Sequence, residues 1–167
     1  MNKKQGTRRE PAAKSPTPRS KSMRLPMAPA IASEIALDYH LTLEVLRSGR
    51  GDEYHLGSIA QATCTAMLVS QLRDTSVRPG LFCEAKNAIL RCRRAGFDTG
   101  FWIADEQACA VLAEILAVLD QQLATVPLEC FKVANESLKK IFSTTNLDPK
   151  GSDVCLRPPM HSKRDAR

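Results

Sequence analysis

The sequence predicts an all-α protein, a bundle of about five helices between two tails. Apolar residues recur at spacings of three and four along five segments, as on one face of an α-helix. No segment alternates strictly between apolar and polar residues, as a half-buried strand does. Proline and glycine fall between the periodic segments. We therefore expect a disordered basic arm at residues 1–27, a helical domain at 28–142 and a disordered tail at 143–167.

The first predicted helix lies in "PAIASEIALDYHLTLEVLRSG", where Pro29 suits the first turn and Gly49 the end. One apolar face comprises Ile31, Ile35, Tyr39, Leu43 and Leu46. A second stripe comprises Leu37, Leu41 and Val45, which predicts a helix covered on more than one side. His40 adjoins the core face, so a packed, hydrogen-bonded side chain is the simpler interpretation and a catalytic role the alternative.

A loop, "GRGDEYH", separates this segment from the second helix, "LGSIAQATCTAMLVSQLRD". The second helix has an apolar face of Leu56, Ile59, Ala60, Thr63 and Met67. Pro79 and Gly80 then interrupt the chain.

The third helix, "LFCEAKNAILRCRRAG", carries the first candidate binding face. Its apolar side comprises Phe82, Ala85, Ile89 and Cys92, with Gly96 as the expected C-terminal cap. The opposite side carries Asn87, Arg91 and Arg94, flanked by Arg93. Asparagine and arginine read adenine and guanine edges, so this face could enter a major groove. Glu84 would repel phosphates there, and arginines that only complement the helix dipole are the alternative.

The fourth segment, "FWIADEQACAVLAEILAVLDQQLATV", predicts the central helix, capped by Asp105 with Glu106 in the first turn. Its apolar face comprises Leu112, Ile115, Leu116, Leu119, Leu123 and Val126. A strip of Ala110, Ala113, Ala117 and Ala124 would let another helix approach closely, within the fold or from a second subunit in a homodimer. Phe101 and Trp102 form an expected hydrophobic plug before the cap, with ligand stacking by Trp102 as the alternative.

Pro127 begins the fifth predicted helix, "PLECFKVANESLKKIFS". The residues expected to face inward are Phe131, Ala134, Leu138, Ile141 and Phe142.

The net charge of +6 is unevenly distributed. Residues 1–27 carry eight basic groups against one acidic group, a net of +7, and residues 143–167 carry a net of +2. The intervening domain has 11 basic and 14 acidic groups, a net of −3. Any contact with a polyanion is therefore expected mainly from the arm.

The sequence shows no pattern typical of an enzyme or a metal site. The six cysteines are Cys64, Cys83, Cys92, Cys109, Cys130 and Cys155. None forms a CxxC pair, and no histidine lies at zinc-finger spacing from them, so most are expected to be small buried hydrophobic residues. Glycine-rich phosphate loops, GxSxG and HExxH are absent from the sequence. We expect no cofactor, no metal and no catalytic residues.

No apolar run of about 20 residues and no secretory signal is visible, which predicts a cytoplasmic protein without a membrane partner. A conventional helix-turn-helix is not visible either, because the first connection is expected to span about seven residues and the others carry proline or several glycines.

The segments "LDYHLTLEVLRSGRGDEYHLGSIAQ" and "TGFWIADEQACAVLAEILAVLDQQLATVP" resemble a family of small, uncharacterised bacterial all-helical proteins, some labelled Fis-like transcriptional regulators. The resemblance covers about residues 28–140. It implies a helical fold and a regulatory role, and it carries over no active-site residues.

We therefore expect a non-enzymatic, nucleic-acid-associated accessory or transcriptional regulatory protein that contacts DNA or RNA with low specificity. The alternative is a helical protein–protein interaction or dimerisation module with solvated tails. The candidate nucleic-acid-binding residues are Lys3, Lys4, Arg8, Arg9, Lys14, Arg19, Lys21 and Arg24 of the arm and Asn87, Arg91 and Arg94 of the third helix.

Overall fold

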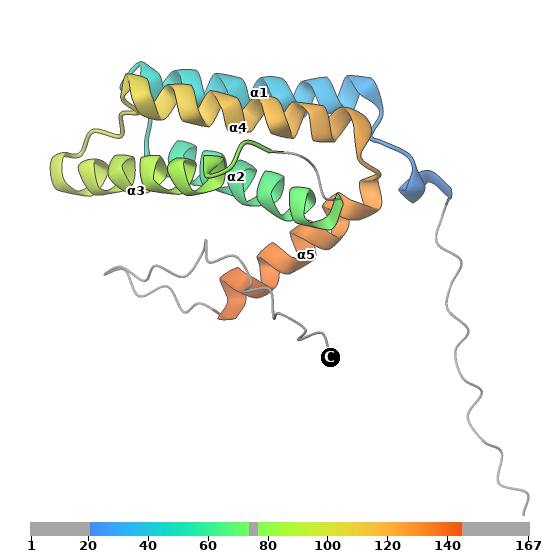
Figure 1. The fold of residues 1–167 in the computed structure, drawn as a ribbon. Helices are drawn as coiled ribbons and strands as arrows, with labels where there is room; N and C mark the ends of the chain where they lie inside the picture. The colour runs from blue at the N-terminus through green and yellow to red at the C-terminus, as the bar shows by residue number, and fades with distance from the viewer. Residues whose placement is uncertain (1–20, 74–76, 145–167) are drawn as a thin grey trace, which may run out of the picture.

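The computed structural model describes residues 21–73 and 77–144 and confirms the predicted all-α class. A short 3-10 helix, η1, precedes five α-helices (Figure 1). Their bounds are η1 Lys21–Arg24, α1 Pro29–Arg47, α2 Glu53–Arg73, α3 Leu81–Thr99, α4 Glu106–Thr125 and α5 Leu128–Thr144.

Helices α1 to α4 run alternately in opposite directions and form a four-helix bundle (Figure 1). Helices α1 and α3 each pack against both α2 and α4, and α2 and α4 also contact one another. Helices α1 and α3 thus occupy opposite corners of the bundle. Helix α5 packs outside this bundle, against α2 and η1.

Helix α4 is the central helix, as predicted, because it packs against the other three helices of the bundle. All six residues of its expected apolar face are buried. By length and composition alone, its 20 residues could also cross a membrane, a possibility that the sequence argument had excluded. A helix enclosed by three neighbours needs the same apolar composition, and that is the role α4 has here.

A buried amide lies among these apolar residues. The Gln122 side chain is 1% exposed, and its Nε2 donates hydrogen bonds to the Ala66 carbonyl oxygen (3.0 Å) and the Ser70 hydroxyl (2.8 Å) of α2. Both bonds require Gln122 to stand opposite one particular turn of α2. Gln122 therefore fixes the axial alignment of α4 on α2.

Two predicted helix boundaries were wrong. Helix α2 begins at Glu53, not after His55, because the Asp52 carboxylate accepts a hydrogen bond from the His55 backbone N–H (3.0 Å) and so caps the added turn. The connection from α1 is accordingly residues 48–52, shorter than expected. Helix α3 passes through Gly96 and ends at Thr99, because Gly100, with φ of 78°, supplies the left-handed cap.

Gly96 serves packing instead of termination. A Cβ atom at this position would lie 2.4 Å from the Trp102 ring, so only glycine admits the indole against α3. The backbone beside Trp102 also pairs with Gly51, which brings the α3–α4 connection onto the α1–α2 connection. Trp102 therefore joins both connections at one end of the bundle.

The second apolar stripe of α1 is not covered, contrary to prediction. Leu37 is 59% exposed and Leu41 is 56% exposed, and only Val45 is half-buried. These residues lie on the side of α1 that faces neither α2 nor the core, and α5, which could have covered them, packs on α2 instead.

Residues 21–27 belong to the folded domain and not to the expected arm. Residues 21–24 form η1, the Leu25 carbonyl oxygen accepts a hydrogen bond from the Leu128 N–H (2.9 Å), and Met27 packs against the core. At the other boundary, α5 continues to Thr144. Residues 1–20 and 145–167, assigned to the two tails, lie outside the described residues.

The packing of Trp102 on Gly96 can be tested by comparing two glycines. We expect Gly96→Ala to lower the free energy of unfolding by about 1–3 kcal/mol, because the new methyl group displaces the indole. Gly57→Ala is the matched control, since its site in α2 has no atom within 4 Å of an added Cβ. Alanine should stabilise that helix position by about 0.5–1 kcal/mol. Urea unfolding followed by circular dichroism measures both, and equal effects would refute this role of Gly96.

Candidate nucleic-acid interface

The outer face of α3 is the strongest candidate for contact with a polyanion. Buried residues occupy the inner side of the helix, facing α2 and α4. At 100° per residue, the opposite side comprises Cys83, Asn87, Leu90, Arg94 and Phe97, all exposed. No helix packs over this side in the described part of the chain.

Basic side chains concentrate along this face. Residues 86–99 contain Lys86, Arg91, Arg93 and Arg94 against one acid, Asp98. Of the predicted residues, Asn87, Arg91 and Arg94 are all exposed on α3, as expected. The extension of α3 to Thr99 also moves the arginines away from the helix end, so they are poorly placed to complement the helix dipole.

The contacts of Arg91 and Arg93 within the protein are weak. The Arg91 guanidinium lies 4.0 Å from the Asp105 carboxylate, at the limit of an ion pair. The Arg93 guanidinium lies 5.4 Å from the centre of the Phe97 ring, in a cation–π arrangement. Both contacts hold the arginines close to the helix surface and can be exchanged for a phosphate.

Glu84, the acid expected to repel phosphates, is neutralised locally. The Arg78 guanidinium donates two hydrogen bonds to Glu84 (2.9 and 2.8 Å) and two more to Glu114 of α4 (2.9 and 3.1 Å). Hydrogen bonding and the positive charge of Arg78 lower the pKa of Glu84. The carboxylates of Glu84 and Glu114 in turn raise the pKa of Arg78. This three-residue clamp connects the start of α3 to α4 and reduces the repulsion that Glu84 would exert.

Aromatic residues extend the face beyond the end of α3. Trp102 is half-buried on Gly96, and its ring meets Phe97 edge to face at 5.1 Å. Trp102 therefore acts as the predicted plug. Phe101 does not, because it is 64% exposed, and Phe97 is 57% exposed. Phe97, which Arg93 contacts, and Phe101 thus both expose their rings to solvent.

The arm residues can be located only in part. Lys21 and Arg24 lie in η1, and Arg24 is exposed. The other six, Lys3, Lys4, Arg8, Arg9, Lys14 and Arg19, lie outside the described residues. Residues 21–24 adjoin α5, which does not contact α3 closely enough to unite the two basic regions into one site.

A groove between α1 and α4 brings together residue types that can serve catalysis, namely His40, Glu44 and Cys109. The arrangement does not activate the cysteine as a nucleophile. The Cys109 thiol donates a hydrogen bond to the Ala104 carbonyl oxygen (3.3 Å), and burial raises its pKa, so it stays protonated. The Nε2 atom of His40 lies 2.9 Å from the Asp120 carboxylate of α4. His40 is hydrogen-bonded, as expected from the sequence, but its side chain is 45% exposed and not packed.

The prediction that most cysteines are buried is confirmed only in part. Cys64 and Cys92 are buried, Cys109 and Cys130 are half-buried, Cys83 is exposed and Cys155 lies outside the described residues. Burial raises the pKa of Cys92. In residues 21–73 and 77–144, no three histidine, cysteine or acidic side chains come close enough to hold a metal ion.

The clamp of Arg78, Glu84 and Glu114 predicts a pH-dependent stability. Because the pKa of Glu84 is lowered in the folded protein, its contribution is complete above the unfolded pKa and is lost as the pH falls through the folded pKa. Glu84→Gln should therefore lower the thermal midpoint at neutral pH, and the difference should vanish in acid. Glu34→Gln, at an exposed α1 glutamate, is the control. A difference that persists in acid would show that the clamp does not act through charge.

Comparison of the chain with protein-family models, with curated proteins and with solved structures finds no match, so the resemblance to the bacterial helical family stays a prediction.

Proposed function

We propose that this protein is a non-enzymatic, nucleic-acid-associated accessory or regulatory protein whose α3 face docks on the phosphate backbone. The supporting observation is the outer side of α3, where Arg94 lies opposite the core, Lys86, Arg91 and Arg93 flank it, and Glu84 is held by Arg78. Arginine suits this role, because its planar guanidinium pairs with phosphate through two hydrogen bonds.

The dimensions of α3 suit the proposal. Its 19 residues span about 28 Å at ~1.5 Å per residue. A helix of that length can lie along a groove or across the backbone of a duplex, with α2 and α4 behind it. If the arginines pair with phosphates, Asn87 is left as the residue that reads a base edge, so the contact would be mainly electrostatic and of low sequence specificity.

The basic arm would add affinity without adding specificity. Without Lys21 and Arg24, which belong to the folded domain, residues 1–20 hold six basic groups against one acid, a net of +5, whereas residues 28–142 hold −3. Binding through charge releases counterions, and neutralising about six phosphates gives a slope of roughly −5 in log K against log salt.

The proposal predicts separate effects of the arm and of α3. Binding to a random duplex across a salt series should weaken when residues 1–20 are removed. Arg91→Ala with Arg94→Ala should weaken binding further and reduce the salt slope by about 2, because two phosphate contacts are lost. Lys132→Ala with Lys140→Ala, on α5, removes the same charge elsewhere and is the control. Equal losses from the two pairs would remove α3 from the interface.

A second candidate function, self-association, is favoured by the uncovered surface on α1 and α4. The contact between His40 and Asp120 marks where the two helices meet. Residues three or four apart are neighbours on a helix surface, so Leu37 lies beside His40 on α1. Ala117 and Ala124 lie beside Asp120 on α4 for the same reason, and all three therefore flank the line where the two helices meet. The four alanines of the predicted strip are exposed, as are Leu37 and Leu41.

A second copy of the chain fits this surface by shape. The leucines of α1 project, whereas the alanines of α4 leave a shallow strip beside them. Under a two-fold axis, the leucines of each copy would lie on the alanines of the other, as an isologous interface requires. Burying Leu37 and Leu41 in each copy would supply the apolar contact.

Self-association predicts a mutation-sensitive dimer. Light scattering of the full chain should show a dimer at high concentration, and Leu37→Glu with Leu41→Glu should make it monomeric, because a charge would be buried against the alanines. Leu72→Glu is the control, since Leu72 is 49% exposed on α2. A wild-type chain that stays monomeric throughout would refute the interface.

A further inference from the structure

Large apolar side chains are exposed where α3 ends, beside its basic side chains. Phe97, in the last turn of α3, is 57% exposed, Phe101 is 64% exposed and Ile103 is 44% exposed. Exposed polar groups bond to water, whereas an exposed ring has no such partner, and covering it with another apolar surface is favourable. Several exposed apolar side chains in one short segment mark a contact surface. The chemistry around the rings indicates the partner.

The backbone that carries the two rings is held by hydrogen bonds. The Thr99 hydroxyl donates to the Ala95 carbonyl oxygen (2.7 Å) and accepts from the Phe101 N–H (3.1 Å). The Gly100 N–H donates to the Gly96 carbonyl oxygen (2.9 Å). The rings therefore project from an ordered turn, and a partner that covers them does not first have to order the chain.

Arginine side chains adjoin the first ring. The Arg93 guanidinium lies 5.4 Å from the centre of the Phe97 ring, and Arg94, three residues before Phe97, is its exposed neighbour on the helix surface. The nearest acid in the sequence, Asp98, sets one negative charge against these two positive ones. A ring flanked by cations suits a partner that combines a flat apolar surface with negative charge.

The bases and phosphates of a single nucleic-acid strand have these two properties. In a duplex each base is stacked between its neighbours, and its edge is the part that a protein reads. In a single strand the face of the base is open and stacks on aromatic side chains, while cations follow the phosphates. Phenylalanine has no polar atom for a phosphate or a base edge, so stacking is the contact that suits Phe97 and Phe101.

A lipid surface fits this part of the protein less well. A helix that lies in a membrane interface turns a continuous apolar face to the lipid. The apolar face of α3 is buried against α2 and α4, and its outer side alternates between polar and apolar residues, namely Asn87, Leu90, Arg94 and Phe97. Such alternation suits a strand in which phosphates and bases also alternate.

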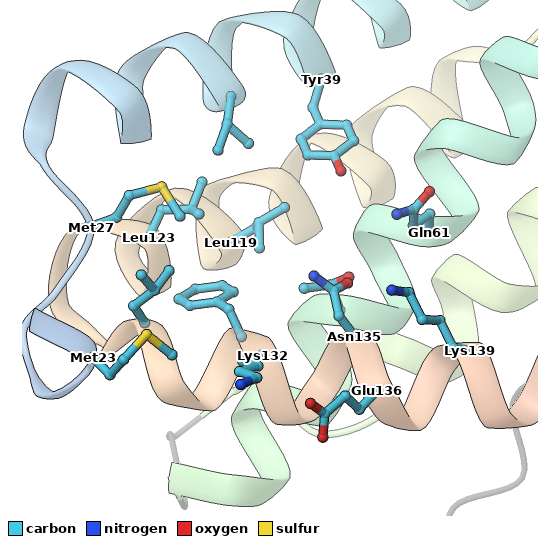
Figure 2. A pocket seen from close by; sticks show the side chains of 14 residues that line it. Met23, Met27, Tyr39, Gln61, Leu119, Leu123, Lys132, Asn135, Glu136 and Lys139 are labelled. Atoms are coloured by element: carbon cyan, nitrogen blue, oxygen red, sulfur yellow. The ribbon is translucent and has the colours of Figure 1, made fainter. Parts of the chain in front are cut away.

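The cavity between η1, α1, α2, α4 and α5 lacks this combination of groups (Figure 2). It has a volume of about 490 Å³, and the charged residues that line it have both signs, Lys132, Glu136 and Lys139. Its two aromatic side chains, Tyr39 and Phe131, are half-buried and buried, respectively. The end of α3 differs because its rings are exposed and its arginines outnumber the neighbouring acid.

We propose that the end of α3 binds single-stranded nucleic acid in preference to a duplex, with bases stacked on Phe97 and Phe101 and phosphates held by Arg93 and Arg94. This preference rests on the proposed function, because the arginines of α3 supply the phosphate contacts. The Cα atoms of the two phenylalanines are at most about 14 Å apart, at up to ~3.6 Å per residue, so both rings serve one short stretch of the strand. When a phosphate draws Arg93 away, that face of Phe97 is released for a base.

The affinities of the full chain for a single strand and for a duplex test the proposal. Phosphate contacts alone favour the duplex, because its charge density is higher. We expect instead that a deoxythymidine strand of about 20 nucleotides binds at least about tenfold more tightly than a duplex of the same length, by fluorescence anisotropy at equal salt. A uridine strand measured in parallel separates RNA from DNA, and tighter binding of either strand than of the duplex supports the proposal.

Variants of the second ring test the stacking itself. Phe101→Leu should weaken binding of the deoxythymidine strand by about tenfold, because one stacked base is lost, and leave duplex binding unchanged. Phe101→Trp keeps a ring and should retain the affinity for the strand. Leu72→Ala is the control, since it removes an exposed apolar side chain from α2. An abasic strand of equal length needs no variant, and without bases it should bind about tenfold more weakly than the deoxythymidine strand.

Three results would overturn the proposal. Equal affinity for duplex, single strand and abasic strand would remove the stacking, and the proposed function would survive if Arg91→Ala with Arg94→Ala still weakened binding. Binding to none of these nucleic acids would overturn the proposed function as well. Binding to phosphatidylglycerol vesicles alone, lost in Phe101→Leu, would assign the rings to a lipid surface and overturn both.

Discussion

The fold depends on the burial of the apolar face of α4, which covers almost half of the circumference of this helix. Leucine and isoleucine side chains on that face leave water only when α1, α2 and α3 all pack against it. Apolar burial has no direction, so it does not by itself fix how far each helix slides along its neighbours. The hydrogen bonds from Gln122 to Ala66 and Ser70 supply that alignment for α2, and the clamp of Arg78, Glu84 and Glu114 supplies it for α3.

The alignment of α4 on α2 has a free-energy cost at the Gln122 amide. Its Oε1 is buried with no hydrogen-bond partner among the described residues. An unsatisfied buried acceptor costs about 1–3 kcal/mol. The apolar surface buried around α4 has to offset that loss, and the result is a core that specifies one arrangement of α2 and α4.

Helices and most of their apolar faces could be predicted from the sequence because both follow from local periodicity, although Ile31 of the expected α1 face is 52% exposed. The cap at Asp105 and the core face of α4 were predicted in this way and are observed. The roles of Gly96 and Leu37 could not be predicted, because each depends on a distant segment. Gly96 is needed because Trp102 folds back onto it, and Leu37 stays exposed because α5 packs on α2 and not over α1.

The same division applies to the candidate sites. Asn87, Arg91 and Arg94 could be placed on one helix face from their spacing alone. The engagement of Glu84 by Arg78 was missed, since Arg78 lies outside the helix, before Pro79 and Gly80, and no helical spacing relates the two residues. A cavity lined by η1, α1, α2, α4 and α5 was missed as well, because its lining residues come from separate elements and have no sequence spacing in common.

The placement of α1 and α3 at opposite corners of the bundle has a geometric consequence. If two copies join through α1 and α4, their α3 helices point away from one another, on the outer ends of the pair. Such a pair could not grip a single duplex between its halves, as a clamp does. It would instead hold two separate stretches of nucleic acid at a set distance, which is the geometry of a cross-linking protein.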